Sequence, residues 1–205
     1  LVYRLARIGG RTPAVTLLLA GFAVSTVLGY TVSFLLIVND RLQLNLPRLY
    51  AWLLGGVAVN EWSQLAVIAP LILVTGAAAG GFGRSLNALS LGEDAAARLG
   101  VPVERDKRLL IVAGSLLTAA AVSVSGMIGF VGLIVPHVVR LLCGPDHRLL
   151  IPAAALGGAI FLVVADLLAR TVLSPAELPV GILTAFLGGP YFLYLLRSTR
   201  REYRL

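Results

Sequence analysis

Long apolar stretches separated by short polar segments divide the chain into pieces of membrane-spanning length. A helix needs about 20 predominantly apolar residues to cross a hydrocarbon core about 30 Å thick. Stretches without Asp, Glu, Lys or Arg therefore mark candidate spans. They predict transmembrane helices over residues 14–38, 62–83, 109–124, 130–143, 149–170 and 178–196. The pattern predicts an all-α, polytopic membrane protein with six crossings.

Two apolar segments do not fit a simple crossing. The charge-free stretch over residues 109–139 would be about 46 Å long as one helix, too long for one crossing. Its middle reads Ser125-Gly-Met-Ile-Gly129, which favours a break, so we predict two helices joined by a tight turn. Residues 46–59 are too short to span. Tyr50 and Trp52 suit the headgroup level, so we predict a short interfacial or re-entrant helix there.

Composition and charge agree with a membrane protein. The chain has 205 residues, of which 58% are hydrophobic and only 13% charged, too few to coat a soluble domain of this size. The net charge is +7. Given the predicted spans, 14 of the 17 Lys and Arg residues fall on one side of the membrane, and Arg41, Arg48 and Arg170 fall on the other. This asymmetry predicts that both chain ends are cytoplasmic, and it explains the basic excess without nucleic acid.

Recognisable catalytic motifs are absent from the sequence. Lys107 is the only lysine, and no phosphate-binding loop of the form G-x-x-x-x-G-K occurs. No H-E-x-x-H motif or cysteine pair suggests zinc, since Cys143 is the only cysteine. Ionisable residues within the predicted spans are few, and His137, Asp166 and Arg170 are the candidates among them.

A glycine-rich segment surrounds His137. Gly126, Gly129 and Gly132 recur at every third position, a spacing that lets helices approach closely, and Pro136 removes one backbone hydrogen bond. The segment is either a hinge with His137 as a polar anchor or a tightly packed helix with a hydrogen-bonded histidine. A metal or proton-relay role for His137 alone is the weakest interpretation.

Asp166 and Arg170 are four residues apart, so on a helix they share a face and can pair. The pair either neutralises charge at a helix end or leaves Arg170 to meet an acidic partner protein. Glu177 is expected in the same outer loop.

A polar loop over residues 90–104 follows the second predicted span. Glu93, Asp94 and three alanines favour a short helix, with Ser90 or Gly92 at its start and Gly100 at its end. The small alanine-rich face fits a groove on a soluble partner, and a plain solvated loop is the alternative.

Several motifs follow one another in the order of a known family. The run Leu91-Gly-Glu-Asp-Ala-Ala-Ala-Arg-Leu-Gly-Val101 resembles the coupling-helix loop of FecCD-type permeases, the membrane subunits of ABC importers for ferric siderophores, haem and cobalamin. Residues 129–140 resemble that family's most recognisable motif. Further segments match in the family order over residues 144–148, 166–170, 177–184 and 188–192. The resemblance covers nearly the whole chain and is densest from Leu91 onward.

The resemblance implies roles for particular residues. It assigns contact with a cytoplasmic ABC ATPase dimer, which would carry ATP and Mg²⁺, to Gly92, Glu93, Asp94, Arg98, Leu99 and Gly100. Arg170 would contact an acidic residue of an extracytoplasmic substrate-binding protein. The span over residues 14–38 would line the translocation pathway, with a gate region at Thr12 and Pro13. The chain itself would hold no cofactor or metal and would not be an enzyme.

The family fold has ten transmembrane helices per subunit and works as a dimer with a second copy or a homologue, in the bacterial cytoplasmic (inner) membrane. With six spans, and with Met127 as the only methionine, the chain is expected to be one permease domain over residues 1–205 that lacks about four N-terminal helices. Residues 1–11 would then be the end of the fourth family helix and the loop after it.

Two other functions were weighed against an importer. An ion-driven secondary transporter would need intramembrane carboxylates near the midplane, and Asp166, the only candidate, lies near a helix end. An intramembrane enzyme would need a paired carboxylate, a zinc motif or an activated nucleophile. Within the importer family a ferric siderophore is the first expectation for the substrate, followed by haem and cobalamin.

Overall fold

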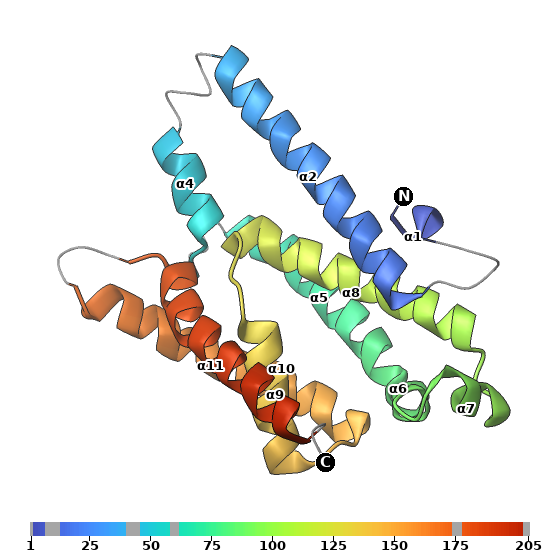
Figure 1. The fold of residues 1–205 in the computed structure, drawn as a ribbon. Helices are drawn as coiled ribbons and strands as arrows, with labels where there is room; N and C mark the ends of the chain where they lie inside the picture. Colours follow the sequence, from blue (N-terminus) through green and yellow to red (C-terminus); the bar gives the residue numbers. More distant parts are fainter. Residues whose placement is uncertain (1, 7–12, 40–45, 58–61, 174–177, 203–205) are drawn as a thin grey trace. The chain divides into compact units, whose positions relative to one another are not determined.

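Helices account for all the regular secondary structure in the described part of the chain (Figure 1). The computed structural model describes residues 2–6, 13–39, 46–57, 62–173 and 178–202. The chain divides into two compact units, Leu1–Leu49 and Tyr50–Leu205. The predicted all-α class is confirmed.

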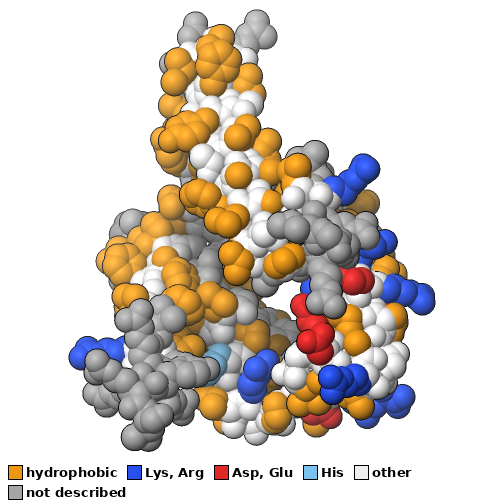
Figure 2. Space-filling model, turned by 45° about the vertical axis from the view of Figure 1, so that its right-hand side comes forward, with side chains coloured by type: hydrophobic (Ala, Val, Ile, Leu, Met, Phe, Trp, Pro, Cys, Tyr) orange, Lys and Arg blue, Asp and Glu red, His pale blue; other side chains and the backbone are white. Residues whose placement is uncertain are grey.

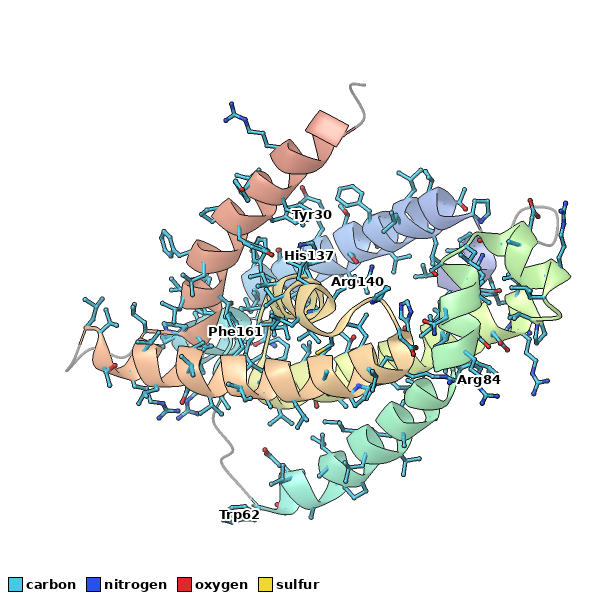
Figure 3. All side chains as sticks on the ribbon, turned by 90° about the horizontal axis from the view of Figure 1, so that it is seen from below. Tyr30, Trp62, Arg84, His137, Arg140 and Phe161 are labelled. Atoms are coloured by element: carbon cyan, nitrogen blue, oxygen red, sulfur yellow. The ribbon has the colours of Figure 1, made fainter. Side chains whose placement is uncertain are left out.

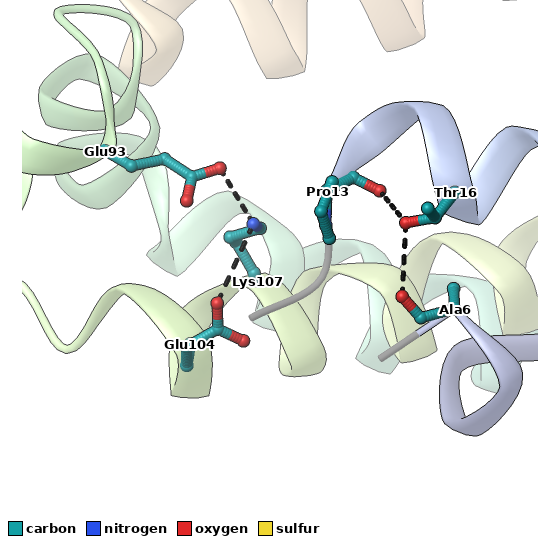
Figure 4. A network of polar contacts seen from close by, with 6 residues as sticks. All are labelled: Ala6, Pro13, Thr16, Glu93, Glu104 and Lys107. Atoms are coloured by element: carbon teal, nitrogen blue, oxygen red, sulfur yellow. Dashed lines mark hydrogen bonds and ion pairs between the residues drawn. The ribbon is translucent and has the colours of Figure 1, made fainter. Parts of the chain in front are cut away.

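The first unit contains α1 (Val2–Leu5) and α2 (Ala14–Val38), which pack against each other. A side-chain hydrogen bond links the two segments: Thr16 Oγ1 donates to the carbonyl oxygen of Ala6 at 3.1 Å. The same hydroxyl lies 2.8 Å from the carbonyl oxygen of Pro13 (Figure 4). Pro13 directly precedes α2, where a proline with an extended backbone suits a helix start. Helix α4 (Leu46–Leu54) crosses the boundary between the units, within the segment predicted as a short interfacial helix.

In the second unit, α10 (His147–Thr171) packs against α5 (Trp62–Gly81), α6 (Gly83–Leu89), α9 (Val131–Cys143) and α11 (Val180–Glu202). Helix α8 (Val103–Ser125) packs on α5. Two small core clusters hold α10: Val135 and Val139 meet Leu150, and Ala165 and Ala169 meet Val180. Phe161, labelled in Figure 3, covers the first cluster.

Most apolar side chains of these helices are exposed. Figure 2 shows hydrophobic side chains lying openly on the surface, and in the four most apolar helices at most 11% of the membrane-length window is buried. Apolar surface of this extent is unfavourable in water and suits hydrocarbon. By length and composition, four helices can cross a membrane: Val15–Val38, Trp62–Gly81, Val103–Ser125 and His147–Thr171.

The other two predicted spans are apolar over fewer residues, although α11 itself continues to Glu202. They cover Val131–Cys143 and Val180–Leu195 as apolar segments, and the first follows a break at Gly126. Two helix boundaries differ from the prediction for one reason: the start of α8, and the end of α11, which lies at Glu202 instead of residue 196. The predicted span over residues 109–124 starts six residues early, at Val103, because charged residues continue a helix as readily as apolar ones. Helix α6 was not predicted, since its seven residues carry no long apolar stripe.

Candidate functional site

Helix α7 (Glu93–Arg98) lies in the loop predicted to meet a cytoplasmic partner. Gly92 before it has φ 104° and Gly100 after it has φ 82°, a backbone conformation that side chains other than glycine rarely adopt. The first turn carries Glu93 and Asp94 and the last turn Arg98, which places each charge beside the helix end that favours it. The two glycines and the charges therefore define a short, bounded helix.

The outer surface of α7 forms a groove of ≈ 580 Å³. Its lining residues are Leu91, Gly92, Glu93, Asp94, Ala95, Arg98 and Leu99. Leu91 and Leu99 are 69% and 66% exposed, whereas Ala96 on the opposite side is fully buried. Five of the six residues predicted to contact the partner line this groove, and Gly100 makes the turn that follows.

Lys107 joins α7 to α8. Its Nζ lies 2.8 Å from Oε1 of Glu93 and 3.9 Å from Oε1 of Glu104 (Figure 4). The lysine side chain is only 18% exposed, so its charge is held between the two carboxylates. Lys107 was not among the predicted site residues, although its being the only lysine in a basic chain was a usable signal.

Helix α6 connects the groove to two longer helices. Ser85 Oγ donates a hydrogen bond of 2.6 Å to Oδ2 of the buried Asp106 in α8. Asn87 Nδ2 donates a hydrogen bond of 2.7 Å to Oδ1 of Asp146, which caps α10. This bond, together with the Arg148 N–H that the same carboxylate accepts, lowers the pKa of Asp146 below its ordinary value. These four side chains, Ser85, Asn87, Asp106 and Asp146, were also absent from the predicted site.

The glycine-rich segment has two different environments. Gly126 has φ 67°, and a Cβ there would collide with the carbonyl oxygen of Trp52. A Cβ at Gly129 or Gly132 would meet nothing within 4 Å in the described residues. Pro136 lies inside α9, and the His137 ring makes an edge contact with Tyr191 of α11 at 6.1 Å between ring centres. A hinge at this segment stays a prediction. His137 is labelled in Figure 3.

Arg170 makes the predicted pair with Asp166. Its Nε lies 2.8 Å from Asp166 Oδ2, and its Nη2 donates to the carbonyl oxygen of Val57 at 3.3 Å. The arginine side chain stays 47% exposed, so a face of the guanidinium is accessible. Glu177 and Thr12 lie outside the described residues, and contact of Arg170 with a binding protein stays a prediction.

A metal centre is not evident in the described ranges, where no group of three or more His, Cys, Asp or Glu side chains converges. The candidate site thus comprises a groove on α7, the ion pair behind it and the polar contacts of α6.

Comparison with known proteins gives consistent matches along the chain. The model of the FecCD transport family matches residues 1–198. The cobalamin import system permease protein BtuC of Halobacterium salinarum is 50% identical over 203 residues, which cover 99% of this chain and 53% of that protein. The hemin transport system permease protein HmuU of Yersinia pestis is 45% identical over 202 residues, which cover 98% of this chain and 60% of that protein.

Two further matches extend the comparison. The Fe(3+)-citrate import system permease protein YfmD of Bacillus subtilis is 40% identical, with 98% of this chain and 59% of that protein covered. A solved structure described as a metal-chelate type ABC transporter, in an inward-facing conformation, superposes with a TM-score of 0.82 at 36% identity. The matched region covers 90% of this chain and 59% of the chain in that structure. The chain thus spans between half and three-fifths of the length of these relatives.

Proposed function

The chain belongs to the FecCD transport family, and we propose that it forms part of a permease subunit of an ATP-driven importer for a metal chelate. The observation that carries this proposal is the exposed groove of α7, which is lined by residues of the motif that resembles the family's coupling-helix loop. The four membrane-length helices and the permease relatives support a multi-pass membrane protein, and we place it in the cytoplasmic membrane.

In this proposal a soluble ABC ATPase dimer binds the groove. The exposed Leu91 and Leu99 offer apolar contacts at its two ends, and Glu93, Asp94 and Arg98 offer charges of both signs between them. When ATP closes the ATPase dimer, α7 moves with it, and the bond from Lys107 to Glu93 carries that movement to α8. ATP and Mg²⁺ would bind to the partner, and this chain would perform no covalent step.

The other partners follow the same reasoning. Arg170, half-exposed beside Asp166, would meet a carboxylate of a substrate-binding protein. A second copy of the permease or a homologue, together with lipid, would cover the exposed apolar faces of the helices. Thr12 and Pro13 would lie at the gate of the pathway lined by α2.

The substrate class is supported by three relatives named for cobalamin, hemin and ferric citrate. We propose a chelated metal of this class, with ferric siderophores included. The test is uptake by proteoliposomes that contain the permease with the ATPase and binding protein that copurify with it. We expect ATP-dependent accumulation of one of three probes: cyanocobalamin, haemin or ferric citrate. Uptake that proceeds without any ATPase and follows a proton or sodium gradient would refute the proposal.

A further inference from the structure

Helix α6 has two polar sides that face different helices. Successive helical residues are about 100° apart, so Ser85 and Asn87 point about 200° apart, while Gly83 and Asn87 share a side. Ser85 meets Asp106 near the start of α8, and Asn87 meets Asp146 and His147 at the start of α10. Helix α6 therefore bridges the beginnings of two membrane-length helices.

Asn87 uses both ends of its amide at the start of α10. Nδ2 donates to Asp146 Oδ1 at 2.7 Å, and Oδ1 accepts the backbone N–H of His147 at 2.9 Å. A carboxylate can only accept and a backbone N–H can only donate, so these partners fix the orientation of the amide. Oδ1 also lies 2.7 Å from His147 Nδ1, which must then carry the proton. Asn87 thus satisfies one of the free N–H groups at the start of α10.

The backbones of α6 and α10 are in close contact at the same place. Gly83 is buried, and a Cβ added to it would lie 3.1 Å from Cγ and 3.3 Å from Cα of Arg148. At its other end α6 is nearly continuous with α7, because only residues 90–92 separate the two helices. Ser90 Oγ donates to the Asn87 carbonyl oxygen at 2.7 Å, which stiffens this short connection. The groove on α7 is therefore connected to the start of α10 by a short segment and a close helix contact.

We propose that Asn87 is a positioning residue for transport, which passes the displacement of α7 to α10 through its bonds to Asp146 and His147. The inference rests on the proposed function of the chain as an importer permease. It adds a second route to the one that runs from Glu93 through Lys107 to α8. Movement of α7 would then reach α8 and α10 together and tilt both helices in one step.

The test compares Asn87 variants with wild type in proteoliposomes that contain the copurified ATPase and binding protein. The probe is whichever of cyanocobalamin, haemin and ferric citrate the wild-type protein accumulates. Asn87→Leu removes both the donor and the acceptor of the amide while keeping a side chain of similar volume. Asn87→Asp places a second carboxylate against that of Asp146. We expect either variant to keep its ATPase and to hydrolyse ATP, but to lose at least about tenfold in probe molecules transported per ATP hydrolysed.

The exchange pair Asn87→Asp with Asp146→Asn restores a donor opposite an acceptor, so we expect it to recover at least half of the transport per ATP. Thr118→Ala, whose hydroxyl in the described structure donates to the Gly114 carbonyl oxygen within α8, is the control and should behave as wild type. Unchanged transport per ATP in both single variants, loss of the copurified ATPase, or an exchange pair no better than Asn87→Asp would overturn the inference. Absence of ATP-driven uptake in the wild type would instead refute the proposed function.

Discussion

Lys107 Nζ lies 2.8 Å from Glu93 Oε1, so the only lysine of the chain connects the first turn of α7 with the fifth residue of α8. Because Glu93 is 54% exposed, solvent screens the pair, and its contribution to stability should be about 0.2–1 kcal/mol. We expect Lys107→Met to leave the unfolding temperature in detergent nearly unchanged while it reduces transport per ATP severalfold.

A double-mutant cycle separates this pair from its neighbour. Lys107→Met and Glu93→Gln should be non-additive for transport per ATP, because each removes the same contact. Glu104→Gln is the comparison: its Oε1 lies 3.9 Å from the lysine, so it should couple to Lys107→Met more weakly than Glu93→Gln does. If Lys107→Met and Glu93→Gln combine additively, the ion pair does not transmit movement.

Reversing the charges along the α7 groove should uncouple the ATPase from transport. In Glu93→Arg with Arg98→Glu, each helix end carries the charge that its dipole disfavours, and the groove presents an inverted pattern to the partner. We expect the protein to insert normally while ATP-dependent uptake falls at least about tenfold. Arg105→Glu, an exposed reversal outside the groove, is the matched control. Normal uptake by the double variant would contradict the docking role.

Arg170 should govern affinity for a substrate-binding protein. Arg170→Glu replaces an exposed cation with an anion beside Asp166, so an acidic partner surface would be repelled. We expect the dissociation constant to rise about tenfold at low salt, and the difference from wild type to shrink as ionic strength increases. Asp166→Asn keeps the cation and should not weaken binding. Equal affinities for Arg170→Glu and wild type at low salt would refute this contact.

Gly126 should tolerate substitution far less well than Gly129. Gly126→Ala places a Cβ against the Trp52 carbonyl oxygen at a backbone conformation, φ 67° and ψ −161°, that favours glycine. Strain of this kind costs about 1–3 kcal/mol, so the unfolding temperature in detergent should fall by several degrees. Gly129→Ala meets open space in the described residues and should show little change. Comparable unfolding temperatures for the two variants would contradict the close contact.

The carboxyl group of Asp146 should report the Asn87 contact by its titration. The Asn87 amide and the Arg148 N–H stabilise the carboxylate, so its pKa lies below the ordinary 3.8. The stabilisation is present above that ordinary value and is lost as the pH falls through the lower pKa of the folded protein. Carbon-detected NMR of labelled aspartates should show the pKa rising in Asn87→Leu. An unchanged value would mean that Asn87 does not hold the carboxylate.

Sequence reasoning found the helices because apolar stretches of membrane length are long and distinctive. It found the helix at Glu93 because two acidic residues, three alanines and an arginine stand between glycines. The pair of Asp166 and Arg170 followed from helical spacing alone, and the structure confirms it. These features are local, so the sequence contains all that is needed to predict them.

The contacts of α6 could not be predicted in the same way. Asn87 and Asp146 are 59 residues apart, and their meeting depends on how α10 packs against α6. A short helix with a serine and an asparagine resembles an ordinary loop until its neighbours are placed. The different surroundings of Gly126 and Gly129 likewise arise from α4, which contacts only the first of them.

The shortness of α9 has a consequence for the surrounding bilayer. Its 13 residues rise about 20 Å, well below a hydrocarbon thickness of about 30 Å. The non-helical residues 126–129 before it would therefore lie within the depth of the acyl chains, where exposed peptide groups are costly. The end of α4 and the residues after it cover the start of this segment, with the Trp52 carbonyl against Gly126 and the Gly56 N–H bonded to the Ser125 carbonyl at 2.8 Å. Helix α4 and the residue pair after it thus keep the backbone around Gly126 away from lipid at the point where the chain leaves α8.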